Sequence, residues 1–485
     1  MRSTFFGLNI GYKGLAAQQR ALDVTSHNIA NANTPGYTRQ DVIMEASPAN
    51  KVLEGYIGTG VNITNFRRIK EDFIDIQMRT ENKALGEWET KDHITSKLEV
   101  VFNEPSDSSM RSVLDQFWEA WQTLSKNPES VAARTNVMQR GITLTDTFNH
   151  MDTHFVDLQS DINKGIGLKV NEINTQARQI RDLNLQIMKA EAGGQTANDL
   201  RDKRDLLLEQ LSKNISIDVI EDEFGAVNVS VSGKTLVSRA VLGEIRFKDD
   251  NPLDPTSAAL EWYEPISNTA QGSVRLSGGV LKGYFDMRDD VIPNYQDKVS
   301  LLAKTIAEEV NTLHRAGFGL DKNTGRNFFT ATDPLADFSA QNIQVNPDIV
   351  GNTNFIAAAV EVADPDDPGA DPTVYQGDNT NALAIVRLKN KLTMSNGVAS
   401  FDDFYMSTIG QLGVQGQETH QMVENRGYLI EQLINQRESV SGVSLDEEMT
   451  NMIKYQHAYS AAARVITAMD EMLEVLINRL GIVGR

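Results

Sequence analysis

One stretch of regular apolar spacing, between residues 130 and 192, constrains the fold of this chain more than any other feature. Apolar residues recur there at intervals of three and four, which is the period of one helix face. This face carries Leu144, Phe148, Met151, Phe155, Leu158, Ile162, Ile166, Val170, Ile173, Ile180, Leu183 and Ile187. A single helix over 130–192 would be about 95 Å long at a rise of ~1.5 Å per residue. That length predicts an elongated, rod-like body.

Both ends of the chain carry apolar residues that recur every seven positions. In the N-terminal helix predicted over the first 33 residues, these are Leu8, Leu15, Leu22 and Ile29. A C-terminal helix is predicted to begin at the capping pair Ser444 and Glu447. Its two apolar tracks are Leu445, Met452, Tyr459, Ile466, Leu473 and Leu480, and Tyr455, Ala462, Met469 and Leu476.

Such repeats are typical of left-handed coiled coils, although an ordinary helical bundle shows them too. Neither terminal helix can bury its stripe alone. We therefore expect the two helices to pack on each other and on further copies of the chain, and we interpret these heptad residues as an assembly interface.

The remaining pattern predicts a mainly α fold with β insertions. Its parts are terminal coiled-coil helices, an elongated helical-bundle rod domain and a small antiparallel β outer domain. The expected boundaries are 1–50 and 441–485 for the terminal domain, 51–214, 279–330 and 378–440 for the rod, and 215–278 for the β domain. The β prediction rests on the alternation in Ile215–Val219 and Val227–Val231. Residues 331–377 are expected to be an irregular or β insertion with an acidic loop at 364–371.

Charge and composition limit the possible partners. The chain has 46 Lys and Arg against 66 Asp and Glu, a formal net charge of −20, which argues against binding to nucleic acid or to anionic lipid. There is no cysteine, so disulfides and thiol chemistry are excluded. No apolar run approaches the ~20 residues that span a bilayer, and the N-terminal segment does not have the pattern of a cleaved secretory signal.

We find no pattern that predicts a catalytic residue, a cofactor site or a metal site. His150 and His154 have helical i, i+4 spacing but belong to no metalloprotease motif, so a solvated helix face is the favoured interpretation. Residues 321–327 have no EF-hand order and are interpreted as a turn. Phe117, Trp118 and Trp121 have helical spacing and are expected in the core.

A turn follows the N-terminal helix. Asn28, Asn31 and Asn33 crowd the helix exit, where asparagine suits the backbone geometry. Pro and Gly at the second and third positions of Thr34-Pro35-Gly36-Tyr37 predict a type II turn.

These residues also carry a family resemblance. Residues 28–40, Asn-Ile-Ala-Asn-Ala-Asn-Thr-Pro-Gly-Tyr-Thr-Arg-Gln, closely resemble the N-terminal signature of the bacterial flagellar axial proteins, which comprise rod, hook and hook-associated subunits. The Pro-Gly-Tyr-Thr-Arg-Gln form is most similar to the hook-associated subunits. Further segments resemble the family at 68–79, 199–207, 278–283, 311–314, 442–449 and 455–465. Residues 220–277 and 330–377 have no specific match.

The resemblance implies a structural subunit, not an enzyme, that joins the hook to the filament and is required for filament assembly. It implies export without cleavage through the flagellar type III apparatus, and an extracellular location at the hook–filament junction. The implied partners are further copies of the chain in a ring or helical oligomer, the hook protein, hook-associated protein 3, and an export chaperone that binds the C-terminal helix. The alternatives are a hook or distal rod subunit, a cytoplasmic coiled-coil scaffold, and a wall hydrolase carried on a flagellar part.

Overall fold

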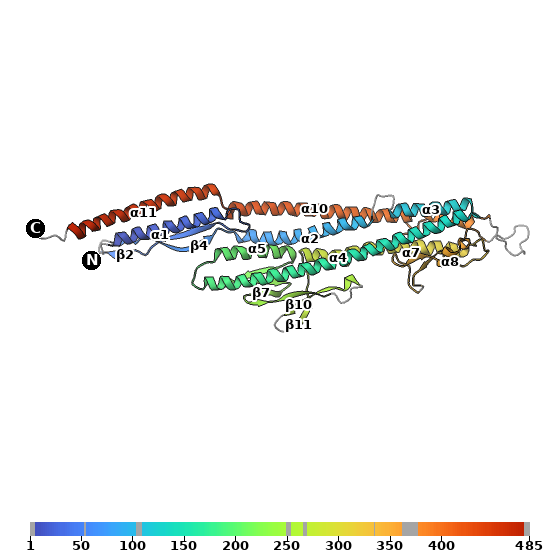
Figure 1. Cartoon of the computed structure of the whole chain (residues 1–485), viewed down its shortest axis with the longest axis horizontal. Coiled ribbons are helices and arrows are strands. Elements are labelled where there is room, and N and C mark those ends of the chain that lie inside the picture. Colours follow the sequence, from blue (N-terminus) through green and yellow to red (C-terminus); the bar gives the residue numbers. More distant parts are fainter. Residues whose placement is uncertain are drawn as a thin grey trace, which may run out of the picture.

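The computed structural model describes residues 5–52, 55–102, 109–248, 254–264, 269–333, 335–360 and 377–479, with the backbone alone for 476–479. The molecule is elongated, and the first and last helices that the structure describes lie together at one end (Figure 1). Long helices fill most of it, and small antiparallel sheets lie along one side. The predicted fold class is confirmed.

Helix α4 (Val131–Glu191) is the longest helix and runs along the rod as one piece, as the periodicity predicts. The hydroxyl of Ser130 accepts a hydrogen bond from the amide of Ala133 and caps its start. The inward face is fully buried at Ile166, Ile173 and Ile180. Three other long helices of the rod are α2 (Asp72–Phe102), α7 (Ile292–Ala316) and α10 (Phe401–Ser441).

Helices α2 and α10 lie antiparallel. Arg426 of α10 donates to Glu81 near the start of α2, at 2.8 Å, and Thr419 donates to Asp92 further along, at 3.4 Å. Three shorter helices complete the rod: α3 (Met110–Lys126), α5 (Asn198–Asn214) and α6 (Val280–Asp286). A five-residue π-helical segment, Met287–Val291, joins α6 to α7.

The far end of the rod contains an aromatic core. Phe117 and Trp121 of α3 are fully buried and pack against Phe328, with ring centroids 6.0 and 5.4 Å apart. Trp118 stacks on Phe401 at 6.0 Å. The predicted core position of this aromatic group is confirmed.

The β insertion packs against α4 (Figure 1). One sheet is a meander of four strands: β5 (Asp218–Glu221), β6 (Val227–Val231), β7 (Lys234–Ser238) and β8 (Val241–Leu242). The other contains β9 (Glu244–Lys248), β10 (Ala259–Glu264) and β11 (Thr269–Ser273).

Two buried asparagines of α4 fix these sheets to the helix. The amide of Asn184 donates to the carbonyl of Val227 at 2.8 Å and accepts from its backbone amide at 3.1 Å. Asn174 makes the same pair of bonds with Ile245, at 2.7 and 3.0 Å. Each amide thus pairs with the backbone of one strand residue, which satisfies buried polar groups on both sides.

The second insertion is small. It contains strand β13 (Ile343–Val345) and helix α8 (Pro347–Gly351); strand β12 (Phe329–Ala331) lies at its start, and helix α9 (Thr380–Arg387) follows it in the part expected to be rod. Short 3₁₀ turns occur at Pro255–Ser257, Thr353–Phe355 and Leu388–Asn390. The expected acidic loop at 364–371 lies outside the described residues. The carboxylate of Asp321 accepts bonds from Asn323 and Arg326, as expected of a local turn.

The terminal unit consists of α1 (Phe6–Ala30), strands β1 (Gln40–Ala46), β2 (Asn50–Val52), β3 (Gly55–Ile57) and β4 (Val61–Arg68), and α11 (Leu445–Arg479). β1 pairs with β4 from Gln40↔Arg68 to Ala46↔Val61. The boundary expected at residue 50 falls at the first residue of strand β2, between the paired strands β1 and β4 in the sequence. Through the pairs β1–β4 and β2–β3, these strands lie together in the terminal unit.

Candidate functional site

The terminal helices α1 and α11 pack on each other in antiparallel orientation, away from the rod (Figure 1). Glycines of α1 face the apolar track of α11. A Cβ placed on Gly11 would lie 2.9 Å from Cγ1 of Ile466, and one on Gly7 would lie 2.5 Å from Cε of Met469. Absence of a side chain at these positions therefore lets the two helices approach closely.

The α1 side of this contact differs from the expected one. Its buried residues are Gly11, Ala17, Ala21, Thr25 and Asn28, and with Gly7 and Gly14 they follow one another at spacings of three or four. The heptad Leu8, Leu15, Leu22 and Ile29 lies one position further round the helix and is only half-buried. The apolar pattern did not predict a line of small residues as the contact, since small residues carry little periodic signal.

On α11, the residues of the expected interface are mostly half-buried. This group contains Met452, Tyr455, Tyr459, Ile466, Met469 and Leu473. Leu445 is half-exposed, and the side chain of Leu476 lies outside the description. Further apolar side chains of the pair remain exposed to solvent: Phe5, Tyr12, Met449, Ile453, Val465, Met472 and Val475. Ile453 is 54 % and Tyr12 is 66 % exposed, so the pair leaves substantial apolar surface uncovered.

The predicted type II turn forms after α1. Gly36 has φ +76°, and the amide of Tyr37 donates to the carbonyl of Thr34 at 3.1 Å. A Cβ on Gly36 would lie 3.2 Å from Cβ of Leu206, so the turn also touches the rod. Asn31 caps the end of α1 by donating to the carbonyl of His27 at 3.0 Å. Asn33 and Pro35 are exposed.

Asn28 is the buried centre of this region. Its side chain donates to the carbonyl of Gln40 at 2.9 Å, and its oxygen accepts from the amide of Gln40 at 3.0 Å. The same oxygen accepts from the hydroxyl of Tyr37 at 2.7 Å. Asn28 also donates to Glu448 of α11 at 3.1 Å. Burial, followed by the nearby carboxylates Asp199 and Asp202, raises the pKa of Tyr37, which keeps its hydroxyl a donor.

Arg39 links the same segment to α11. Its guanidinium donates to Glu448 at 2.8 Å and to Glu447 at 2.7 Å, and its backbone amide donates to the carbonyl of Ser441. These contacts explain why Asn, Tyr and Arg occur together in residues 28–40: the side chains of Asn28, Tyr37 and Arg39 join α1 and β1 to α11.

Helix α5 presents three carboxylates to the terminal unit. Asp199 accepts from Gln40 at 2.8 Å, and Asp202 accepts from the backbone amide of Thr38 at 3.0 Å. Arg68 lies between Asp202 and Asp205, at 2.8 and 2.9 Å. Residues 199–207 were marked only by the family resemblance, and no role was predicted for these carboxylates, although their regular spacing of three was a signal.

The two carboxylates that share Arg68 differ in their pKa values. Burial raises the pKa of Asp202 more than Arg68 lowers it. Burial also acts on Asp205, but Lys70 and Arg68 together outweigh it and hold the pKa of Asp205 below its usual value. The second cation, Lys70, lies 2.5 Å from Asp205 and accounts for the difference.

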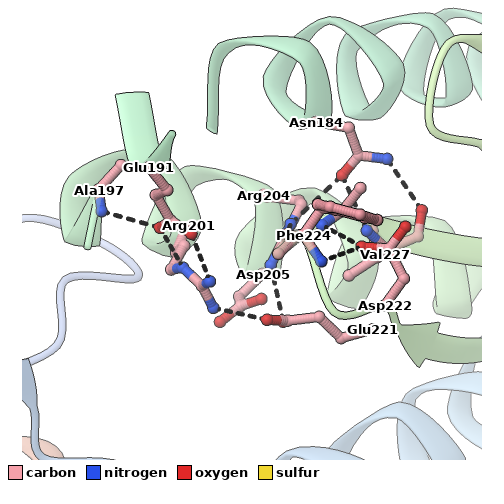
Figure 2. A network of polar contacts seen from close by, with 12 residues as sticks. Asn184, Glu191, Ala197, Arg201, Arg204, Asp205, Glu221, Asp222, Phe224 and Val227 are labelled. Carbon is pink, nitrogen blue, oxygen red and sulfur yellow. Dashed lines mark hydrogen bonds and ion pairs between the residues drawn. The ribbon is translucent and has the colours of Figure 1, made fainter. Parts of the chain in front are cut away.

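Arginines of α5 fix the helix to the rod and to the β insertion (Figure 2). Arg201 donates twice to Glu191 at the end of α4, both at 2.7 Å, and once to Glu221 at 2.8 Å. The fully buried Arg204 donates to the carbonyl of Gly225 at 2.5 Å and to Glu221 at 3.1 Å. Helix α5 is thus held by ion pairs on one side and offers carboxylates on the other.

The arrangement is that of a packing surface and its support. In the described ranges, no group of three or more His, Asp or Glu side chains could hold a metal ion. His150 and His154 are exposed and contact each other, with ring centroids 4.2 Å apart. No helix within the described ranges has both the length and the apolarity to cross a membrane.

Comparison with known proteins identifies the family. Residues 95–329 match the model of the flagellar hook-associated protein FlgK helical domain. The flagellar hook-associated protein 1 of Bacillus subtilis (strain 168) is 34 % identical over an alignment of 521 positions, gaps included, which covers 100 % of both chains. The chain belongs to the flagellar hook-associated protein 1 family.

Other comparisons agree with this family. The ends match two broader models, flagella basal body rod protein at 8–38 and flagellar basal body rod FlgEFG protein C-terminal at 435–480. The flagellar hook-associated protein 1 of Salmonella typhimurium (strain LT2) is 26 % identical, with 97 % of this chain and 99 % of the relative covered. The solved structure of the flagellar hook junction protein FlgK from Burkholderia pseudomallei shares the fold, with TM-score 0.66 and 16 % identity over 75 % of this chain and 100 % of that chain.

Proposed function

We propose that this chain is a non-enzymatic adaptor subunit that joins the flagellar hook to the filament, outside the cell, and is required for filament assembly. The observation that supports it most is the apolar surface left on the terminal helix pair. Met449, Ile453 and Met472 of α11 are each more than half exposed, as expected of surfaces that further subunits cover.

Subunits would meet through unlike surfaces, head to tail. Such heterologous contacts generate a ring or a helical tube. The terminal unit then forms the inner wall, the rod forms the layer around it, and the β insertion points outward. The assembly interface consists of the exposed residues above together with the half-buried tracks through Leu8, Leu15, Leu22 and Ile29 and through Met452 to Leu473.

The proposed partners are further copies of the chain, the hook protein on one side and hook-associated protein 3 on the other. A cytoplasmic export chaperone would bind α11 before secretion. The exposed apolar residues of α11 support this, because an uncovered stripe of this kind favours aggregation during storage and export.

The interface can be tested by single substitutions in a strain that carries no other copy of the gene. Ile453→Asp places a charge on an exposed face and leaves the contact between Gly11 and Ile466 intact. We expect export and a normal melting curve but loss of filaments. Ile466→Asp and Leu473→Asp should also abolish incorporation while the β insertion stays folded.

The matched control is Ile220→Asp, the same chemical change at a residue that is 70 % exposed on the β insertion. It should leave filament number unchanged. Normal filament number with Ile453→Asp, Ile466→Asp and Leu473→Asp would contradict the assignment of the interface.

Deletion of the gene separates this proposal from that of a hook or distal rod subunit, which the class-wide matches at both ends also allow. Electron microscopy should show complete hooks without filaments, with flagellin shed into the medium. Absence of the hooks themselves would favour the alternative.

A further inference from the structure

Two short segments, 69–71 and 442–444, connect the terminal unit to the rod, and we call this region the neck. Gly442 has φ −72° and ψ 155°, so the chain leaves the helical conformation between α10 and α11. A cavity of about 790 Å³ lies at the neck and is lined by Pro35, Gly36, Leu206 and Gly442 among others. The neck is therefore not filled by a close-packed apolar core.

Polar contacts across the neck come mainly from α5, together with Thr196 just before it, whose hydroxyl donates to the carbonyl of Phe66 at 2.8 Å. The carboxylates Asp199, Asp202 and Asp205, which we call the ladder, follow one another at successive turns of that helix. They bind Gln40, Thr38 and Arg68 of the terminal unit, at 2.8–3.0 Å. Asn198 adds a bond to the carbonyl of Phe66 at 3.0 Å, and His27 Nε2 lies 3.3 Å from Asp199.

Helix α5, which carries the ladder, is held firmly to the rod and to the β insertion. Arg201 and Arg204, on the same helix, bind Glu191, Glu221 and Gly225 of the rod and the β insertion (Figure 2). Any movement at the neck would therefore move the terminal unit against α5, and not α5 against the rod.

The buried ion pair between Arg68 and Asp202 favours one position of the terminal unit against α5. Arg68 is only 12 % exposed, and its partner Asp202 only 6 %. Removal of one member of such a pair leaves the other charge buried without a partner, which is strongly destabilising. Units of one chain that meet through a small, polar interface are expected to move relative to each other once their specific contacts are lost.

We propose that the ladder of α5 is a latch that sets the angle between the terminal helix pair and the rod, with the neck as its hinge. When the ladder is occupied by Arg68, Thr38 and Gln40, the pair is held in line with the rod. When it is vacated, the terminal unit pivots about residues 69–71 and 442–444 while both units stay folded. The inference concerns the single chain and does not rest on the proposed function.

Distance measurement between two spin labels tests the latch on the full chain. The natural sequence has no cysteine, so Asn9→Cys on α1 and Lys189→Cys on α4 provide one label on each side of the neck. We expect a single narrow distance distribution. In Asp202→Asn/Asp205→Asn it should broaden about twofold or shift, since the bound position is no longer favoured over others.

Two controls make the result specific. Glu81→Gln removes an ion pair with Arg426 inside the rod and should leave the Asn9–Lys189 distribution unchanged. A second label pair, Ser96→Cys and Gln179→Cys, lies entirely in the rod and should be unaffected by the double variant.

If the double variant fails to fold, Arg68→Gln provides a second test, because it removes the ion pairs of both Asp202 and Asp205 while leaving the carboxylates in place. We expect it to broaden the distribution in the same way, with the melting curve of the rod retained. An unchanged, narrow distribution in either folded variant would overturn the latch, as would a wild-type distribution as broad as that of the variants.

Discussion

His314 is held neutral by two backbone groups on opposite sides of its ring. Nδ1 lies 2.8 Å from the carbonyl of Arg326, so it must carry the proton, and Nε2 accepts from the amide of Ala357 at 3.0 Å. A second proton on Nε2 would face that amide N–H. Burial, only partly offset by the bond to Arg326, lowers the pKa of His314 to about 4.

The shift predicts how the stability of the rod depends on pH. Since the pKa is lower in the folded chain than the usual ~6.5, the stabilisation is complete above pH ~6.5 and is lost as the pH falls toward 4. Between pH 7.5 and 5 this loss amounts to about 2 kcal/mol in the free energy of unfolding. Urea titrations should show it in the wild type, and His314→Gln should remove it. The exposed His457→Gln is the control; an equal pH dependence in all three proteins would exclude His314 as the cause.

In the terminal unit, the single side chain of Asn28 makes hydrogen bonds with the backbone of Gln40, the hydroxyl of Tyr37 and the carboxylate of Glu448. Asn28→Ala would leave several of these groups buried without partners, at ~1–3 kcal/mol each. We expect hydrogen exchange to report a loss of about 2–4 kcal/mol in the opening free energy of β1 and α11. Asn33→Ala, in the exposed turn, should change it little. Similar losses for both variants would contradict the central place of Asn28.

At the scale of elements, the contact between α1 and α11 depends on which positions of α1 are occupied by glycine. Gly11 faces Ile466 so closely that a Cβ would lie 2.9 Å away, whereas a Cβ on Gly14 would lie 3.9 Å from that of Ala462, an ordinary contact. The two glycines lie on the same helix face, three residues apart, and have the same unfavourable helix propensity.

These two positions make a matched pair. Gly14→Ala should stabilise the terminal helices by up to ~1 kcal/mol through helix propensity alone. Gly11→Ala gains the same propensity but overpacks the contact, at a cost of about 1–3 kcal/mol. Exchange protection of residues 445–479 should therefore rise in the first variant and fall in the second. A rise in exchange protection in both variants would contradict the close contact between Gly11 and Ile466.

Element by element, the sequence was informative where the signal is local and periodic. α4 was expected over 130–192 and spans Val131–Glu191, and the turn at Gly36 follows from Pro and Gly alone. The small-residue face of α1 and the asparagines that hold strands to α4 were not predicted. A glycine or an asparagine at a helical position has no periodic signature, and its value depends on a backbone brought close by the fold.

On the scale of the whole molecule, the missed features are those that join distant parts of the chain. Arg39 and Glu448 are 409 positions apart, and Arg68 and Asp202 are 134 apart. No spacing rule in a single sequence connects such residues. The family resemblance marked residues 28–40 and 199–207 as distinctive, and the structure gives the reason: both segments meet at the neck.

The terminal helix pair has exposed apolar faces, and we propose that only further subunits cover them. Hydrogen exchange of the isolated chain and of the chain assembled on hook tips tests it most directly. Amides of residues 6–30 and 445–479 should exchange much faster in the isolated chain than in the assembly, while those of α4 exchange slowly in both. Equal, strong protection of both terminal helices in the isolated chain and in the assembly would contradict the account.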